Sequence, residues 1–218
     1  MMEDLTYWLP LIWIGLLATA VLLYVILDGF DLGIGILFPF YTREEDRDVL
    51  MNSVAPFWDG NETWLILGGG GLFVAFPTAY GIIMSGFYLP VLIMLLALVL
   101  RGVAFEFRWV AKPKHKIWDV AFAAGSITAA FMQGVILGGL LHGLPVENGL
   151  FAGHVLDWIN FFPFFVGLAT ISGYALLGAT WLIMRTDGEV AVNAREQAKV
   201  LLSIVLFSLC HQYMDPTC

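Results

Sequence analysis

Charged residues are scarce in this chain, because Asp, Glu, Lys and Arg together make up only 13% of its 218 residues. A typical soluble domain carries about 25% charged residues, so about half of the usual polar surface is missing. Hydrophobic residues account for 60% of the chain, aromatic residues for 15%, and the mean hydropathy is +0.84. This composition excludes a soluble enzyme, a nucleic-acid-binding protein and a disordered chain. It predicts an integral membrane protein.

Cysteine and histidine are also rare, which limits metal and haem chemistry. The two cysteines, Cys210 and Cys218, match no metal-binding or redox spacing. No complete apolar stretch holds a histidine near its middle, so we expect no metal site and no haem held by two histidines within this chain. The four histidines lie in loops or in the last apolar stretch: His115, His142, His154 and His211.

Charges are absent from five stretches of the chain, which predict its membrane spans. A transmembrane helix needs about 20 mainly apolar residues. The stretch 63–100 is 38 residues long, so it predicts two helices joined by a turn near 77–81. We therefore expect an all-α, polytopic membrane helical bundle with five full transmembrane helices and an incomplete sixth, forming a single membrane domain over residues 1–218. The uncharged stretches are 8–27, 63–100, 120–146, 158–184 and 200–214.

Basic residues are missing from one side of the predicted bundle, although the net charge of the chain is −8. All ten lie in three segments, 41–56, 101–118 and 185–199. Cytoplasmic loops carry an excess of Lys and Arg, so this pattern predicts an N-terminus outside and the three segments in the cytoplasm. The first residues, Met-Met-Glu-Asp, are acidic, so we expect no cleavable signal peptide.

Some ionisable residues lie at the inner edge of the apolar layer. The carboxylates form pairs with i, i+3 spacing, so a continuous helix presents both members of a pair on one face. Charges at this depth are costly against lipid, so we expect them to face the bundle interior, water or a partner. They indicate a proton-uptake path or a polar pocket for a ligand headgroup, whereas helix capping by Asp59 and snorkelling of Arg101 are structural alternatives. The six residues are Asp28, Asp31, Asp59, Glu62, Arg101 and Glu106.

Three further patterns predict local structure. Residues 43–54 are charged first and apolar later, which is typical of a short surface helix. The four glycines at 68–71 lie in an uncharged span, where they favour close approach of another helix. Gln133 lies in the middle of an apolar stretch, and we expect its amide to hydrogen-bond across helices.

The charged residues belong to longer motifs. Asp-Gly-Phe-Asp-Leu-Gly occupies 28–33, and Asn-Ser-Val-Ala-Pro-Phe-Trp-Asp-Gly-Asn-Glu-Thr-Trp occupies 52–64. Ser-Gly-Phe-Tyr follows at 85–88, and Arg-Gly-Val-Ala-Phe-Glu-Phe-Arg at 101–108. In this order the motifs resemble those of subunit II of cytochrome bd-type quinol oxidases. The resemblance runs from about residue 8 to about residue 200 and covers the ordinary enzymes and their cyanide-insensitive relatives alike.

The resemblance implies a terminal oxidase of the bacterial cytoplasmic (inner) membrane that takes electrons from quinol and reduces oxygen to water. Haems b and d and the quinol-oxidising loop are then expected in a partner, subunit I, with which this chain forms a heterodimer. The chain alone is expected to hold no cofactor and to be non-catalytic. Lipid and a small accessory membrane subunit are further expected partners, and nucleic acid is not.

The resemblance also assigns roles to residues of this sequence. A cytoplasmic proton-uptake path is expected, with Asp59 as the first choice and four further carboxylates as candidates: Asp31, Glu106, Asp28 and Glu62. A structural quinone headgroup or an ion-pair site is the other expected assignment, with these residues: Arg101, Trp58 and Asp31.

The chain departs from the family in length, because members are considerably longer and repeat the helical bundle in their second half. The last uncharged stretch has 15 residues, which as a helix measure about 22 Å, against roughly 30 Å for a hydrocarbon core. We therefore expect a truncated chain. Two other classes stay open, an ion-coupled transporter and a purely structural subunit. Charges near mid-membrane would favour the transporter, and a replaceable Asp59 would favour the structural subunit.

Overall fold

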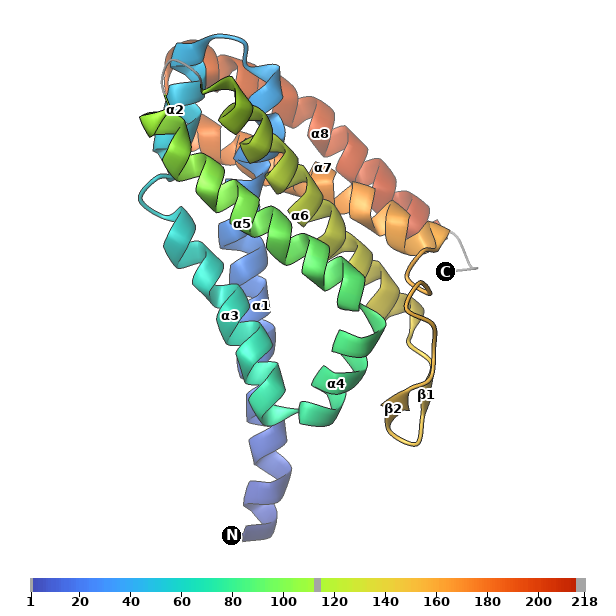
Figure 1. Ribbon diagram of the computed structural model, residues 1–218. Helices are drawn as coiled ribbons and strands as arrows, with labels where there is room; N and C mark the ends of the chain where they lie inside the picture. The colour runs from blue at the N-terminus through green and yellow to red at the C-terminus, as the bar shows by residue number, and fades with distance from the viewer. Residues whose placement is uncertain (1, 112–114, 215–218) are drawn as a thin grey trace.

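The computed structural model describes residues 2–111 and 115–214, and within them the chain is almost entirely helical (Figure 1). The only strands in this part form a short antiparallel hairpin between α6 and α7. The elements are α1 Met2–Leu37, η1 Phe38–Phe40, α2 Glu44–Val54, α3 Trp58–Ala75, α4 Pro77–Gly86, α5 Tyr88–Val110, α6 Lys116–His142, β1 Val146–Glu147, β2 Leu150–Phe151, α7 Phe161–Arg185 and α8 Gly188–Met214.

Four segments of the described chain are long and apolar enough to cross a membrane. They correspond to four of the predicted spans and confirm a polytopic helical membrane protein. Helix α3 has 18 residues, about 27 Å, but Asp59 and Glu62 near its start lower its hydropathy. The total number of spans stays a prediction. The four segments are Thr6–Phe40, Tyr88–Val110, Lys116–His142 and Phe161–Arg185.

The uncharged stretch 63–100 differs from the simple two-helix hairpin expected from its length. It contains most of α3, the whole of α4 and the first half of α5, and α4 crosses between the ends of its neighbours (Figure 1). Pro77 causes the first break, because proline lacks an N–H and is favoured in the first turn of a new helix. Pro90 lies in the first turn of α5 for the same reason.

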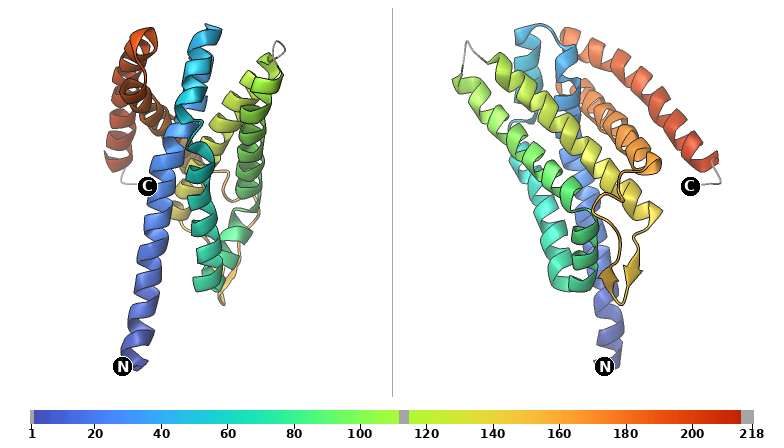
Figure 2. Two further views of the ribbon diagram at one scale, coloured as in Figure 1. Left: turned by 90° about the vertical axis from the view of Figure 1, so that its left-hand side faces the viewer. Right: turned by 45° about the vertical axis from the view of Figure 1, so that its right-hand side comes forward.

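Helix α1 is continuous over 36 residues and extends beyond the other helices at its N-terminal end (Figure 2). Its second half packs against α7 at a crossing of two glycines. A Cβ atom on Gly178 would lie 2.5 Å from the carbonyl carbon of Gly33, so neither position accepts a side chain without moving a helix. The predicted close approach in α3 is confirmed at Gly71, where an added Cβ would lie 2.6 Å from Leu17 of α1.

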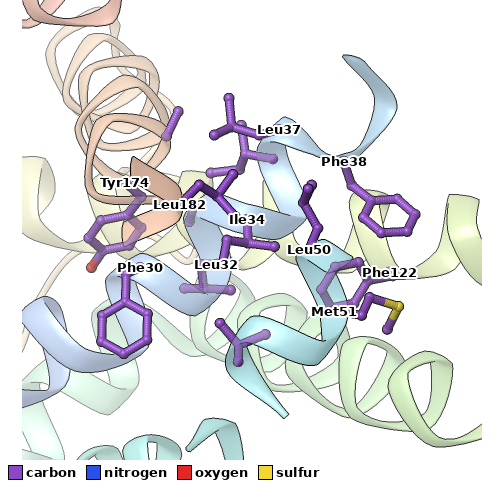
Figure 3. Close-up of a cluster of buried hydrophobic side chains, with 14 of the residues drawn as sticks. Phe30, Leu32, Ile34, Leu37, Phe38, Leu50, Met51, Phe122, Tyr174 and Leu182 are labelled. Carbon is purple, nitrogen blue, oxygen red and sulfur yellow. The ribbon is translucent and has the colours of Figure 1, made fainter. Parts of the chain in front are cut away.

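The buried core lies at the end of the bundle that carries α2, called here the α2 end (Figure 3). The predicted surface helix at 43–54 is confirmed as α2, and its apolar side chains Leu50 and Met51 are completely buried. Figure 3 shows them beside Ile34 of α1 and Phe122 of α6. This short helix therefore closes one end of the bundle instead of lying loosely on it.

The three basic segments of the sequence meet at the α2 end. Helix α2, the end of α5, the start of α6 and the α7–α8 junction lie together there, whereas the N-terminus and α4 lie at the opposite end (Figures 1 and 2). The fold thus separates the two sides of the chain as the distribution of Lys and Arg predicts.

Candidate functional site

Two aspartates of α1 lie inside the bundle, near its α2 end. Asp28 is 0% exposed and Asp31 is 2% exposed. Both face the interior because α1 continues through Leu37, so the i, i+3 spacing places them on one helical face as the sequence predicts.

Arg101 of α5 joins three helices through ion pairs. Its Nη1 atom donates to Asp28 Oδ1 at 2.7 Å, and its Nη2 atom donates to Glu62 Oε2 of α3 at 3.1 Å. Arg101 is only 2% exposed, so the alternative in which it snorkels to the surface is wrong. A buried guanidinium needs such partners, because an uncompensated charge in the interior is strongly destabilising.

Asp31 has a different environment from Asp28. Asn61 of α3 donates from Nδ2 to Asp31 Oδ2 at 2.8 Å and to the carbonyl oxygen of Leu27 at 3.3 Å. The hydrogen-bond partner of Asp31 is thus a neutral amide, whereas that of Asp28 is a cation. Asn61 belongs to a motif noted in the sequence, but its hydrogen bond to Asp31 was not predicted.

A small cavity of about 10 Å³ adjoins Asp31 and Arg101. Its volume corresponds to about one water molecule, but the accessible surface that lines it is apolar. The ring of a quinone does not fit. The lining residues are Asp31, Val54, Trp58, Arg101, Phe105 and Phe122.

The structure brings together four of the six ionisable residues that the sequence placed in one layer. Asp28, Asp31, Glu62 and Arg101 form the buried cluster, but Asp59 and Glu106 lie on the exposed surface of the chain. Capping by Asp59 is also wrong, because the N-cap position of α3 is Phe57 and no side chain makes a capping hydrogen bond there.

A second ionic cluster at the α2 end was missed by the sequence reasoning; we call it the α2 clamp. Arg108 of α5 is 0% exposed and donates to Asp119 Oδ1 of α6 at 2.6 Å and to Asp48 of α2. Arg47 of α2 donates to Asp119 Oδ2 at 3.0 Å. Both guanidinium groups lie within 5.4–5.6 Å of the centre of the Phe38 ring. The clamp fixes α2 against two long helices.

Tyr41 connects the α2 end to α8. Its hydroxyl donates to Oε1 of Gln197 at 3.2 Å. Burial raises the pKa of Tyr41 to about 12, and the nearby carboxylate of Asp46 acts in the same direction. The phenol therefore stays neutral, and stays a hydrogen-bond donor, throughout the physiological pH range.

A third polar group lies among the apolar side chains of the spans. Gln133 of α6 donates from Nε2 to the Tyr24 hydroxyl of α1 at 2.7 Å. The Tyr174 hydroxyl of α7 donates to Gln133 Oε1, also at 2.7 Å. The predicted hydrogen bonding of Gln133 across helices is thus confirmed, although its two tyrosine partners were not predicted.

Among the side chains that the structure describes, in residues 6–111 and 115–210, no group of three or more His, Cys, Asp or Glu residues is arranged to hold a metal ion. Cys210 is a free, exposed thiol, and Cys218 lies outside the described residues.

Comparisons with known proteins agree on one family. The family described as cytochrome bd terminal oxidase subunit II matches residues 9–213. Cytochrome bd ubiquinol oxidase subunit 2 of Bacillus subtilis (strain 168) is 36% identical over 204 residues, covering 91% of this chain and 60% of that protein. Cytochrome bd-I ubiquinol oxidase subunit 2 of Escherichia coli (strain K12) is 36% identical over 211 residues, covering 92% and 56% respectively.

The fold also matches a solved structure, the bd oxidase from Geobacillus thermodenitrificans. The TM-score is 0.73 with 18% sequence identity, over 92% of this chain and 64% of the matched chain. The present chain therefore spans less than two thirds of the length of each of these three proteins.

Proposed function

The chain belongs to the family of cytochrome bd terminal oxidase subunit II, and on this premise we propose that it is the haem-free subunit of a quinol:oxygen oxidoreductase complex. In this proposal it forms a heterodimer with subunit I, which carries haems b and d and oxidises quinol, and a small accessory membrane subunit completes the assembly. The names of the curated relatives as ubiquinol oxidase subunits support it.

The same proposal orients the chain in the bacterial inner membrane, with the N-terminus outside and the α2 end in the cytoplasm. The support is the meeting of all three basic segments at the α2 end, since cytoplasmic loops are enriched in Lys and Arg. The protons consumed in reducing oxygen would then enter from the side of α2.

We propose that the carboxylates of this chain form the cytoplasmic proton-uptake path. Their exposure decreases in steps from the surface inward, which supports the order of the path. Asp59 and Glu106 are exposed and would collect protons, the Glu62 side chain is 29% exposed, and Asp31 and Asp28 are buried.

The environment of Asp31 is the observation that carries this proposal. A proton added to Asp28 would break a buried ion pair with Arg101, whereas a proton added to Asp31 breaks none, because the partner of Asp31 is the neutral amide of Asn61. The buried Oδ1 atom of Asp31 has no hydrogen-bond partner among the described residues, so it can accept a proton without breaking an existing bond. Asp31 is therefore the exchanging group, and Asp28 the fixed counterion of Arg101.

A structural quinone headgroup at Arg101, Trp58 and Asp31 is the less favoured assignment for the same place. Both terminal nitrogens of Arg101 already bond to carboxylates, and the cavity between the three residues has no room for a ring. A quinone would require Trp58 to move away from Phe105, with which its ring packs at 5.2 Å between centroids.

The proposal is tested with Asp31→Asn in the assembled complex, with Asp187→Asn as the matched control at an exposed position of the α2 end. We expect both variants to retain the haem absorption spectrum and subunit I. Quinol-dependent oxygen consumption should fall only in Asp31→Asn, by about 100-fold, the usual contribution of a positioned proton-transfer group. Unchanged turnover in an assembled Asp31→Asn complex would instead support a purely structural subunit.

Two further experiments test the haem-free role of this chain and the alternative of an ion-coupled transporter. Haem that remains with this chain when it is purified without subunit I would refute its haem-free role. Ion transport by the chain alone, reconstituted in vesicles, would favour the ion-coupled transporter.

A further inference from the structure

Asn61 of α3 is a buried amide to which the proposed proton path assigns no role of its own. It lies at the end of the first turn of α3 and is 9% exposed. An amide carries two N–H donors and one carbonyl acceptor, and burying such a group costs free energy unless it is hydrogen-bonded. The partners of this amide therefore show what it does in the fold.

Both N–H groups of the amide are used on one turn of α1. Asn61 Nδ2 donates to Asp31 Oδ2 at 2.8 Å and to the carbonyl oxygen of Leu27 at 3.3 Å. The two acceptors belong to residues four apart on α1, which is about one helical turn. An amide nitrogen has only two protons, so these two bonds use its whole donor capacity.

The carbonyl oxygen of Leu27 decides which end of the amide faces Asp31. A backbone carbonyl is an acceptor only, so the nitrogen end of the amide must point to it. If the amide were turned over, its oxygen would face both the Leu27 carbonyl and the Asp31 carboxylate, and buried acceptors would be left without a donor. Asn61 therefore presents a donor to Asp31 Oδ2 whether Asp31 is charged or neutral.

This bond makes the two oxygens of Asp31 unequal. Oδ2 accepts from Asn61, whereas Oδ1 is buried and has no hydrogen-bond partner among the described residues. In a neutral carboxyl one oxygen carries the proton and the other remains a carbonyl acceptor. A proton on Oδ1 preserves the hydrogen bond from Asn61, whereas a proton on Oδ2 would weaken it.

The nearby cation does not orient Asp31, because its donors are used elsewhere. Arg101 directs its two terminal nitrogens to Asp28 and Glu62. In the part of the chain that the structure describes, Asn61 is the only hydrogen-bond donor to the Asp31 side chain. The orientation of this carboxyl thus depends on a single amide.

We propose that Asn61 is a positioning residue, which holds Oδ2 of Asp31 as a permanent acceptor and confines the binding and release of the proton to Oδ1. This inference rests on the proposed proton-uptake function. Uptake forms one O–H bond at Oδ1 and converts the carboxylate to a neutral acid, and release breaks the same bond. Oδ2 keeps its hydrogen bond through both steps, so the carboxyl does not rotate and the exchanging atom stays in one place.

The test compares Asn61→Leu with Asn193→Leu in the assembled oxidase complex. Leucine is close to asparagine in shape but has no donor, and Asn193 lies at an exposed position of α8. We expect proton uptake and quinol-dependent oxygen consumption to slow by about 10-fold in Asn61→Leu and to stay unchanged in Asn193→Leu, with the haem spectrum intact in both. The loss is smaller than in Asp31→Asn, because the exchanging carboxyl remains but is free to rotate.

Infrared difference spectra show which oxygen of Asp31 carries the proton, and a purely structural role of Asn61 would not determine this. The signal is the C=O stretching band of a protonated carboxyl that disappears in Asp31→Asn. If Oδ1 carries the proton, the band comes from Oδ2. It should then lie at the lower frequency of a hydrogen-bonded carbonyl in the wild type and move to higher frequency in Asn61→Leu. The wild-type frequency tests the assignment by itself, so the test does not depend on assembly of the variant.

Each contrary result refutes a defined part of the inference. A wild-type band at the frequency of an unbonded carboxyl, or a band that stays in place in Asn61→Leu, would overturn the assignment of the proton to Oδ1. A shifted band with uptake as fast as in Asn193→Leu would overturn the positioning role. If Asp31→Asn is slow, these results refute only the inference, whereas unchanged turnover in Asp31→Asn refutes the proton path itself.

Discussion

Removal of the Arg101 side chain is the perturbation for which the structure gives the clearest magnitude. Arg101→Met keeps a long, unbranched side chain but deletes the guanidinium that pairs with Asp28 and Glu62. Asp28 is completely buried, so after the substitution its charge has no compensating cation in the interior. The variant therefore changes the electrostatics of the cluster more than its volume.

Breaking a buried ion pair by removing one partner usually destabilises a protein by about 3–5 kcal/mol. We expect the loss in this chain to lie in that range, because Asp28 keeps no other cation within hydrogen-bonding distance among the described residues. A variant that also neutralises both carboxylates, Arg101→Gln with Asp28→Asn and Glu62→Gln, should recover most of the loss, since no buried charge remains.

The assay measures the thermal midpoint of the detergent-solubilised complex. The complex that survives heating is quantified by size-exclusion chromatography. Arg195→Met is the control, because Arg195 is exposed and its replacement leaves no buried charge. The reasoning predicts a much lower midpoint for Arg101→Met, a midpoint near wild type for Arg195→Met, and recovery in the triple variant. Equal midpoints for Arg101→Met and Arg195→Met would refute it.

Three further predictions concern the packing and the α2 end. Arg108→Met should open the α2 clamp and make α2 accessible to limited proteolysis, whereas Arg43→Met, at an exposed position, should not. Gly178→Val should prevent α1 from packing on α7 and abolish recovery of the folded chain in detergent, whereas Gly173→Ala, which enters open space, should be recovered normally. The raised pKa of Tyr41, about 12 against about 10 in an unfolded chain, makes its contribution to stability complete below pH 10 and lost as the pH rises towards 12. Ultraviolet difference titration against Tyr41→Phe should therefore show its tyrosinate only near the upper value.

Much of the fold could be predicted because it follows from where charge is absent. Long uncharged stretches predicted the four helices that can cross a membrane, and the positions of Lys and Arg predicted the separation of the two ends. Helix α4 was not predicted, because an uncharged apolar stretch does not show how many helices it contains. Within this stretch, only Pro77 and Pro90 indicate where a new helix begins.

The site could be predicted in part, for a physical reason that differs from residue to residue. Asp28 and Asp31 were placed together correctly because spacing along one helix fixes a shared face. Asp59 and Glu106 lie outside the buried cluster, because the face that a helix turns inward depends on its neighbours, which spacing does not specify. Glu62 lies three residues after Asp59, yet only Glu62 reaches Arg101.

The α2 clamp was not predicted, because in the sequence its charged residues resemble ordinary surface charges. Arg108, Asp48 and Asp119 lie on three different helices, and only the packing of α2 against α5 and α6 brings them together. A signal existed in Arg108, which follows Arg101 by seven residues and so lies on the same inward face of α5. Gln133 was predicted because a mid-span amide must find partners wherever its helix turns.

Proton uptake during turnover tests the central claim most directly, namely that Asp31 passes cytoplasmic protons through this subunit. Uptake is measured with a pH indicator in the medium around inverted membrane vesicles, after a pulse of oxygen to the quinol-reduced complex. The account predicts that uptake slows by about 100-fold in Asp31→Asn and is unchanged in Asp187→Asn, with the haem spectrum intact in both. Uptake by Asp31→Asn at the rate of Asp187→Asn would contradict it.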